Sequence, residues 1–593
     1  RADYLQQLLP EGEERLVSGR LETYEDALQM AHPDYVVAPD EAHLIPQIEP
    51  VYPLTAGLTN RSMRKAIAGA LDQLPDLPEW ILSSERGREA WPSFASAMQA
   101  VHAPSDPNDI DPAAGHRRRL AYDELLSDQL ALLLVRASLK RARTPALEAP
   151  GRATRALLHA LPFELTDGQR EVLADIRTDI ESGSRMVRLL QGDVGSCKTI
   201  IALFAMGLVI DGGGQAALMA PTEILARQHA EGLSAFAEAA GLRLAFLSGA
   251  VKGRARAETL SRVAAGEVDI LIGTHALFQA DVAFKDLRLA VVDEQHRFGV
   301  AQRLALAAKG SVPVHLLVMT ATPIPRTLAL AAYGDMDLSE LKQKPAGRKP
   351  ITTRLVPEDR IDEITERLAS ALARGDQAYW VCPAVEDGGK VDMADAETRY
   401  ADLKQRFGER VGLVHGRLKP AEKETVMTRF IEGALSVLVA TTVIEVGVNN
   451  PNATIMVVEN AERFGLAQLH QLRGRVGRGD KGSACVLLYR HPLSEAARAR
   501  LQILRETEDG FLIAEEDFRL RGPGDLLGRR QSGQPYYRLA SFPAHSDLID
   551  RAHSEARHAL AVDPTLRSDR GEALRVLLYL FERDEAVRLL SAG

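Results

Sequence analysis

The stretch Gln191–Leu203, QGDVGSCKTIIAL, decides which kind of protein this chain encodes. Its first nine residues, QGDVGSCKT, lie between the apolar runs MVRLL and IIALFAMGLVI, an order that predicts a strand, a loop and a helix. The loop follows the phosphate-binding pattern G-x-x-x-x-G-K-[ST], except that Cys197 replaces the second glycine. Taken alone, this altered pattern does not separate a phosphate loop from an ordinary strand-to-helix turn.

The chemistry of a phosphate loop explains which residues matter. Backbone N–H groups converge on phosphate oxygens at a helix N-terminus, a lysine adds positive charge, and a hydroxyl ligates Mg²⁺. We therefore predict that Lys198 is catalytic and that the hydroxyl of Thr199 holds the metal. The predicted nucleotide-binding residues of the loop are Gly192, Asp193, Val194, Gly195, Ser196, Cys197, Lys198 and Thr199.

A second motif favours the nucleotide interpretation. LRLAVVDEQHRFGV places Asp293 and Glu294 at the end of an apolar strand, where such a pair can hold Mg²⁺ and activate water. Two carboxylates at a strand end are more often simply solvated. Their position between a phosphate loop and the run MTATPIPRT makes that alternative improbable.

Strand-like runs alternate with amphipathic helices on both sides of the Pro/Gly/Lys-rich stretch LKQKPAGRKPITTR. The first set contains MVRLLQG, AALMAP, VDILIGT, LRLAVVDE and VHLLVMTAT, and the second contains QAYWVCPAV, VGLVHG, LSVLVATT, ATIMVVEN and SACVLLYR. Alternation of this kind predicts parallel sheets wound with helices. We expect a multidomain α/β protein with two such units in tandem, preceded by a small β-rich unit and a helical region and followed by a mostly helical tail.

Composition limits the alternatives without choosing among them. The chain has 593 residues, 46% hydrophobic and 26% charged, with a net charge of −9. This balance argues against a general polyanion binder but allows a local basic groove. The three cysteines make a disulfide framework improbable and favour a reducing compartment. The sequence shows no zinc-like Cys/His spacing and no membrane-length apolar run, and because it starts at Arg1 we expect a fragment.

The motifs together resemble those of superfamily 2 helicases. The resemblance implies Phe163, Gln169 and Asn449 as further ATP contacts, and Gln471, Arg475 and Arg478 of QLHQLRGRVGRG as catalytic residues beside Asp293 and Glu294. Two arginines with interleaved glycines suit stabilisation of charge on the transferred phosphoryl group. The implied DNA-contacting or coupling residues are Thr222, Arg227, Thr274, His275, Thr320, Thr322 and Thr441.

A closer resemblance is to the RecG family of branched-DNA helicases, carried by DEQHRFGV, ATTVIEVGV and DGFLIAEEDFRLRGPGDLLGRRQSG. It implies a partial OB-like wedge at 1–56, a helical linker at 57–150, RecA-like lobes at 151–346 and 347–500, and a translocation motif with a helical domain at 501–593. It also implies ATP, Mg²⁺, a cytoplasmic, nucleoid-associated location and a monomer acting on forks, Holliday junctions and R-loops. Single-stranded-DNA-binding protein is a second candidate partner, and no membrane is expected.

Two alternatives stay open. One is a junction-binding scaffold whose ATPase is impaired by Cys197 and by Asn449, which stands where the family usually has Asp. The other is a translocase of the transcription–repair coupling type, which would need a polymerase-binding module.

The tail stretch RLRGPGDLLGRRQSG, 519–533, contains four glycines and one proline. We expect a loop that emerges from helical flanks, with Arg521 and Gln531 as residues that couple lobe closure to DNA movement.

Cys197 raises a question of backbone geometry. A helical φ would accommodate cysteine at modest cost, whereas a positive φ would strain it by about 1–3 kcal/mol. A thiol at a helix N-terminus beside Lys198 is also expected to be reactive.

Overall fold

The computed structural model describes most of the chain. The described residues are 8–19, 21–24, 27–30, 33–55, 57–141, 144–147, 151–293, 309–310, 312–321, 323, 325, 336–343, 349–383, 385–387, 390–392, 394–441, 450, 452–477, 479, 481–525, 537–541, 544–584 and 586–587. They fall into two compact units, one of Arg1–Ser127 with Tyr537–Glu582 and the other of Asp128–Tyr536 with Arg583–Gly593. The five domain boundaries expected from the sequence stay a prediction.

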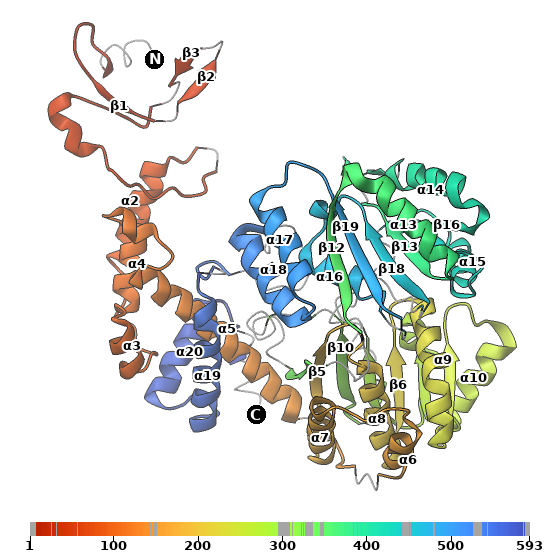
Figure 1. Cartoon of the computed structure of the whole chain (residues 1–593). Coiled ribbons are helices and arrows are strands. Elements are labelled where there is room, and N and C mark those ends of the chain that lie inside the picture. Colours follow the sequence, from red (N-terminus) through yellow and green to blue (C-terminus); the bar gives the residue numbers. More distant parts are fainter. Residues whose placement is uncertain are drawn as a thin grey trace. The chain divides into compact units, whose positions relative to one another are not determined.

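The first unit begins with short strands and continues with helices (Figure 1). Its elements are β1 (Leu16–Ser18), β2 (Glu22–Tyr24), β3 (Ala27–Gln29), β4 (Tyr35–Val37), η1 (Pro39–Leu44), α2 (Asn60–Leu71), α3 (Ser83–Glu89), α4 (Phe94–His102), η2 (Pro107–Ile110), the start of α5 (Gly115–Arg141), α19 (Ser546–Val562) and α20 (Asp569–Leu580). β1 pairs with β4 and β2 with β3, both antiparallel. The expected β-rich start and helical continuation are therefore present, while the OB-like barrel stays a prediction.

The second unit contains the first of two parallel sheets, with strand order β11-β5-β10-β9-β6-β8-β7. Its strands are β5 (Val187–Gly192), β6 (Gln215–Met219), β7 (Leu244–Leu247), β8 (Ile270–Gly273), β9 (Leu287–Val292), β10 (His315–Thr320) and β11 (Asp337–Leu341). The helical elements of this lobe are α6 (Arg152–Ala160), α7 (Asp167–Glu181), α8 (Lys198–Asp211), α9 (Glu223–Ala239), α10 (Gly253–Ala265) and η3 (His275–Phe278). All five strand runs expected for this lobe are confirmed.

The second sheet has the order β12-β19-β18-β13-β17-β16. Its strands are β12 (Ile351–Pro357), β13 (Gln377–Val381), β16 (Val411–Val414), β17 (Val437–Ala440), β18 (Ala453–Val458) and β19 (Ser483–Tyr489), and a separate hairpin joins β14 (Val385–Asp387) to β15 (Lys390–Asp392). The helical elements are η5 (Glu358–Arg360), α13 (Ile361–Ala373), α14 (Ala394–Phe407), η6 (Gly408–Arg410), α15 (Pro420–Ile431), η8 (Ala461–Arg463), α16 (Leu466–Arg473), α17 (Glu495–Glu506) and α18 (Gly510–Asp525).

The two sheets share one topology. If the strands of each sheet are numbered along the chain from β5 and from β12, both orders read 1-6-5-2-4-3, and β11 is added outside β5 in the first lobe. Every pairing within the two sheets is parallel. The expectation of two tandem α/β lobes is confirmed.

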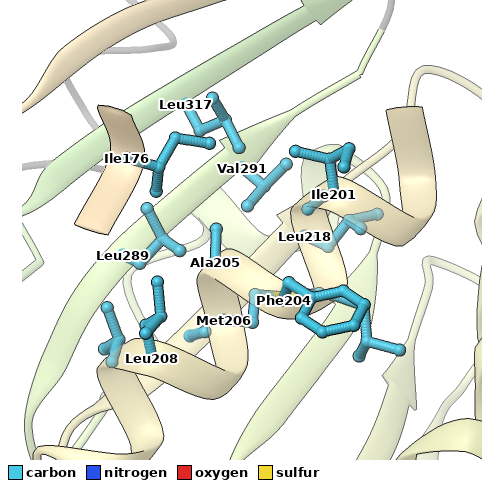
Figure 2. Close-up of a cluster of buried hydrophobic side chains, with 14 of the residues drawn as sticks. Ile176, Ile201, Phe204, Ala205, Met206, Leu208, Leu218, Leu289, Val291 and Leu317 are labelled. Atoms are coloured by element: carbon cyan, nitrogen blue, oxygen red, sulfur yellow. The ribbon is translucent and has the colours of Figure 1, made fainter. Parts of the chain in front are cut away.

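The core of the first lobe forms around α8, because almost every side chain of this helix is apolar (Figure 2). Ile201, Ala205 and Leu208 pack among Leu289 and Leu317 of the sheet, and all five are at most 3% exposed. Burial of one such side chain stabilises by about 1.5–3 kcal/mol. This packing fixes the N-terminus of α8, and with it the phosphate loop, against the sheet.

The expected loop at 519–533 is wrong for its first part, because α18 continues to Asp525. Gly522, Pro523 and Gly524 fall in the last four residues of that helix. Near a helix end, the N–H that proline lacks costs one hydrogen bond and stops the helix without breaking its interior. Residues 526–533 lie outside the described part of the chain. No helix within the described part is both long and apolar enough to span a membrane.

Candidate active site

The phosphate loop connects the buried strand β5 to α8, and Cys197 is the N-cap residue of that helix. Its φ is 61° and its ψ is 36°, which is the left-handed conformation. An L-residue with a Cβ pays about 1–2 kcal/mol to adopt this conformation, whereas glycine does not. Of the two backbone conformations considered for Cys197, the loop therefore has the strained one, with a positive φ.

Lys198 directs its ammonium group into the loop. Its Nζ donates to the carbonyl oxygens of Gly192 at 2.6 Å and of Asp193 at 3.0 Å, and the residue is only 9% exposed. Gly192 is required here, because a Cβ at this position would lie 2.5 Å from Oγ of Ser196 and 2.9 Å from Cβ of Leu341. The loop thus holds a buried positive charge at the point where phosphate oxygens are expected.

Gln169 ties the start of α7 to the same loop. Its Oε1 accepts the Thr166 N–H at 2.9 Å, and its Nε2 donates to the Ser196 carbonyl at 3.1 Å. The side chain is fully buried, and Phe163 packs against the adjacent core. Gln169 therefore supports the phosphate loop directly, while adenine contacts by Phe163 and Gln169 stay a prediction.

Asp293 follows β9, two strands away from the phosphate loop, with β10 between β9 and β5. Because carboxyl ends of parallel strands meet at one edge of a sheet, Asp293 and the loop share that edge. The Oδ2 of Asp293 lies 2.7 Å from Nε2 of His229 on α9, and both side chains are nearly buried. His229 was not singled out from the sequence, since nothing in its local pattern indicates that it reaches the fifth strand.

The donor set at this edge suits Mg²⁺. Thr199 offers a hydroxyl in the first turn of α8, and Asp293 offers a carboxylate oxygen. Mg²⁺ prefers oxygen ligands and is commonly held by one or two carboxylates together with substrate phosphates and water. The described residues therefore fit this ion.

The second lobe contacts the phosphate loop through α16 and the residues that follow it. Nε2 of His470 lies 2.6 Å from Oδ1 of Asp193, and both side chains are 7% exposed. A Cβ on Gly474 would lie 2.9 Å from Cβ of Val194, so only glycine allows this approach. Arg475 follows directly and is 7% exposed. These contacts bring the phosphate loop and the arginine-rich motif together.

Arg473 extends this contact to the tail. Its Nη1 donates to the carbonyl oxygens of Leu504 at 2.6 Å and Thr507 at 2.9 Å, and its Nη2 lies 2.9 Å from Nδ1 of His470. Burial lowers the pKa of the Arg473 guanidinium from its usual value. Gly510, the first residue of α18, packs so closely that a Cβ would lie 2.8 Å from His470 Nε2. Hydrogen bonds thus run from Asp193 to the connection between α17 and α18.

The sequence predicted functional residues in this motif, but it did not single out His470 or Arg473. Gln471 lies in α16 and is partly buried, while His470 and Arg473 make the contacts just described. Their positions in QLHQLRGR were visible, but the residues they meet are far away in the chain. Only the folded arrangement distinguishes them from their neighbours.

The predicted DNA contacts of the first lobe gather at the carboxyl ends of its strands. Thr222 follows β6 and caps α9 through its hydroxyl, whereas Thr274 and Thr320 are buried at the ends of β8 and β10. Arg227 and His275 are exposed, and Arg227 pairs with Glu223 at 3.1 Å.

The remaining predicted residues belong to the second lobe or lie outside the described part of the chain. Thr441 is buried at the end of β17. Glu294, Thr322, Asn449, Arg478 and Gln531 lie outside the described residues, and for Arg521 only its place in α18 is described.

Three family models match the chain. A DEAD/DEAH box helicase domain matches residues 166–330, a helicase conserved C-terminal domain matches 359–480, and "ATP-dependent DNA helicase RecG, domain 3, C-terminal" matches 507–579. The first match spans β5 to β10 of the first sheet and the second spans β13 to β18 of the second lobe, whereas the third covers α18 and most of the helical tail.

Full-length relatives that are similar to this chain are also described as ATP-dependent DNA helicase RecG. The chain is 44% identical to the ATP-dependent DNA helicase RecG of Escherichia coli K12 over 93% of this chain and 81% of the relative. It is 45% identical to that of Bacillus subtilis 168 over 87% and 76%. Among solved structures, RecG bound to a three-way DNA junction matches with a TM-score of 0.66 and 37% identity, covering 94% of this chain and 72% of that one.

Proposed function

The chain belongs to the RecG family of ATP-dependent DNA helicases, and from this premise we propose that it remodels branched double-stranded DNA such as stalled forks, Holliday junctions and R-loops. The observation that carries the proposal is the hydrogen bond between His470 and Asp193, because it joins the phosphate loop of one lobe to the arginine-rich motif of the other. ATP bound between two lobes of one topology can then drive their relative movement.

In the proposed mechanism the phosphate loop binds the nucleotide. The ammonium group of Lys198 leaves the loop carbonyls and binds phosphate oxygens instead. Backbone N–H groups at the start of α8 donate hydrogen bonds to the other phosphate oxygens. Phe163, Gln169 and Asn449 contact the base or ribose, and Gln471, Arg475 and Arg478 approach the transferred phosphoryl group from the second lobe.

Thr199 and Asp293 would hold Mg²⁺, which neutralises charge on the phosphates when it is bound. His229 fixes the orientation of the Asp293 carboxylate through their 2.7 Å contact. Glu294 orients the attacking water and accepts its proton. Thr199, Asp293 and His229 lie at or next to the carboxyl edge of the first sheet, and Glu294 follows Asp293 in the sequence.

DNA would lie along the strand-end residues Thr222, Arg227, Thr274, His275, Thr320, Thr322 and Thr441, with Arg521 and Gln531 transmitting lobe movement to it. We expect a monomer that works on the bacterial nucleoid in the cytoplasm, with single-stranded-DNA-binding protein as a further partner.

The test compares ATP hydrolysis with no DNA, linear duplex, a three-way junction and a four-way junction, and measures strand separation on the same junctions. We expect both junctions to stimulate hydrolysis more than linear duplex and to be unwound. Lys198→Ala is the matched control for the ATP site and should lose both activities. Junction binding without hydrolysis by the parent chain would instead support the scaffold alternative.

A further inference from the structure

The helix α5 has an unusual middle section. Every residue from Arg119 to Leu130 is buried, including the charged side chains of Asp123, Glu124 and Asp128. A buried charge is costly unless it is paired and hydrogen-bonded. The partners of these carboxylates therefore show which other segments are attached to α5. Asp123 is paired with Arg119 at 2.9 Å and accepts the Trp80 indole N–H at 2.7 Å, both within the same unit.

Glu124 has a different kind of partner. Its carboxylate accepts three successive backbone N–H groups, from Arg538 at 2.7 Å, Leu539 at 2.8 Å and Ala540 at 2.9 Å. Glu124 is only 5% exposed. Consecutive N–H groups that converge on one anion form a strong and directional arrangement, since each bond is charge-assisted.

Neighbouring contacts hold the same segment. Tyr537 and Ala540 are 5% and 4% exposed, the N–H of Ser541 donates to Nδ1 of His545 at 3.0 Å, and Nε2 of His545 lies 2.8 Å from the Pro112 carbonyl. Residues 537–541 are therefore fixed to the part of the first unit that contains α5.

Residues 537–541 directly follow the stretch 526–536, which contains the predicted coupling residue Gln531 and is here named the coupling segment. The stretch is preceded by α18, whose first residue packs against His470 and Asp193 of the ATP site. One end of the predicted coupling segment therefore continues from a helix that contacts the nucleotide loop, and the other end continues into residues held by Glu124.

We propose that Glu124 is a positioning residue for DNA movement, because it anchors the C-terminal end of the coupling segment to α5 through three backbone N–H groups. The proposal rests on the proposed function of this chain as a junction-remodelling helicase. A movement that starts at α18 does mechanical work on DNA only if the far end of the segment is held. Without the anchor, ATP is hydrolysed but the movement is lost.

The test uses the full chain with Glu124→Gln, which keeps the side-chain volume, removes the charge and directs an amide NH₂ toward N–H donors. ATP hydrolysis and strand separation are measured on one four-way junction, and hydrogen exchange is followed at the amides of 538–540. We expect strand separation to fall about tenfold or more while hydrolysis stays within about twofold, since the cleft residues are untouched. Exchange should accelerate at 538–540 and stay unchanged in α20.

The matched control is Glu572→Gln, which changes an exposed glutamate in the first turn of α20 in the same unit. It should keep both activities. Glu124→Asp keeps the charge but withdraws the carboxylate by one methylene, so it should give a smaller loss and replaces the glutamine variant if that variant does not fold.

Three results would overturn the anchor. Hydrolysis and strand separation falling together would show that Glu124 supports the motor itself. Normal strand separation with accelerated exchange would show that the held segment is not needed. Unchanged exchange at 538–540 would show that the carboxylate does not hold it. Failure of the unsubstituted chain to separate strands would instead contradict the proposed function.

Discussion

The two parallel sheets have the same strand order, yet among the described residues only the first sheet carries a phosphate loop. In the first lobe β5 leads through the glycine-containing loop to α8, whereas in the second lobe the equivalent strand β12 leads through Glu358–Arg360 to α13. Glu358 at that point is paired with Arg490, which lowers the pKa of its carboxyl group. The same position in the fold thus holds the candidate phosphate loop in one lobe and an ion pair in the other.

The ends of the fifth strands show the same contrast. Asp293 follows β9 and contacts His229, whereas Glu459 follows β18 and is surrounded by donors. Glu459 accepts from Arg399 Nε at 2.5 Å and from the Trp380 indole, and it is 5% exposed. Topology places a carboxylate at the same site twice. In the second lobe its donors hold the lobe together, whereas in the first lobe we propose that the carboxylate holds Mg²⁺.

The largest expected effect is the loss of ATP turnover in Asp293→Asn. The amide removes the negative charge expected to hold Mg²⁺, so hydrolysis on a four-way junction should fall by about two orders of magnitude or more. Steady-state hydrolysis at saturating ATP measures the effect, with Glu459→Gln as the equivalent change in the second lobe. Comparable loss of turnover in both variants at a temperature where both are folded would remove the functional distinction between the lobes.

The second prediction concerns stability, and here the order of the two carboxylates reverses. Glu459→Gln leaves Arg399, which is 21% exposed, without its buried anion. Removing one partner of a buried pair typically costs about 3 kcal/mol or more, and we expect the lower end because Arg399 is partly exposed. Urea unfolding followed by hydrogen exchange in β18 would report the loss. Asp293→Asn should change the stability of its own lobe less.

The sequence predicted the strands of both lobes well because they are continuous apolar runs. Among the strands of the two sheets, it missed β7, β11 and β12, which are short, partly polar or adjacent to Pro350. These three strands lie at the sheet edges, where one side of the strand needs no apolar partner.

The sequence indicated only those residues of the candidate site that belong to local motifs. Lys198, Asp293 and Arg475 belong to local patterns, so their positions could be read along the chain. His229 and His470 act on residues 64 and 277 positions away, and only tertiary contact reveals such partners. The left-handed φ of Cys197 is also set by the loop as a whole.

The third prediction uses a histidine that only the first lobe has at the start of its sixth strand. His315 opens β10 and is fully buried, whereas Ser483 opens β19. Burial, together with Arg288 and Arg185, lowers the pKa of His315 to about 4, and its Nδ1 accepts the Met186 N–H at 3.0 Å.

The direction of the pH effect follows from that shift. The neutral ring is the form the folded lobe favours, so its stabilisation is fully present above pH about 6.5 and is lost as the pH falls toward about 4. The loss should reach up to about 3 kcal/mol at the acid end. The protection of β10 amides, which is the slowing of their exchange relative to that of an unfolded chain at the same pH, should fall more between these pH values than the protection of β19 amides. His315→Asn should flatten the difference. An equal fall of protection in both strands of the parent would contradict the prediction.

The smallest expected effect concerns Cys197, the position where the first lobe departs from the phosphate-loop pattern. Its left-handed φ costs about 1–2 kcal/mol in a residue with a Cβ. Cys197→Gly removes this strain, and if the strained turn forms only to bind phosphates, ATP affinity should rise about 5- to 30-fold. Titration with ATP measures the change. If Cys197→Gly binds ATP with the affinity of the parent but unfolds at a higher temperature, the strain is present in the nucleotide-free loop as well.

Thiol alkylation gives an independent control for the same variant, because the three cysteines differ in access. Cys197 is partly exposed, whereas Cys382 and Cys485 are 0% and 1% exposed, and burial raises the pKa of both, for Cys485 to about 12. An alkylating reagent should therefore modify Cys197 first and inactivate the parent, since a group added there fills the space beside Lys198. ATP should protect the parent, and Cys197→Gly should keep its activity throughout. Inactivation of the glycine variant at the same rate would show that the sensitive thiol is Cys382 or Cys485 of the second lobe. Cys197 would then be strained without being the reactive cysteine.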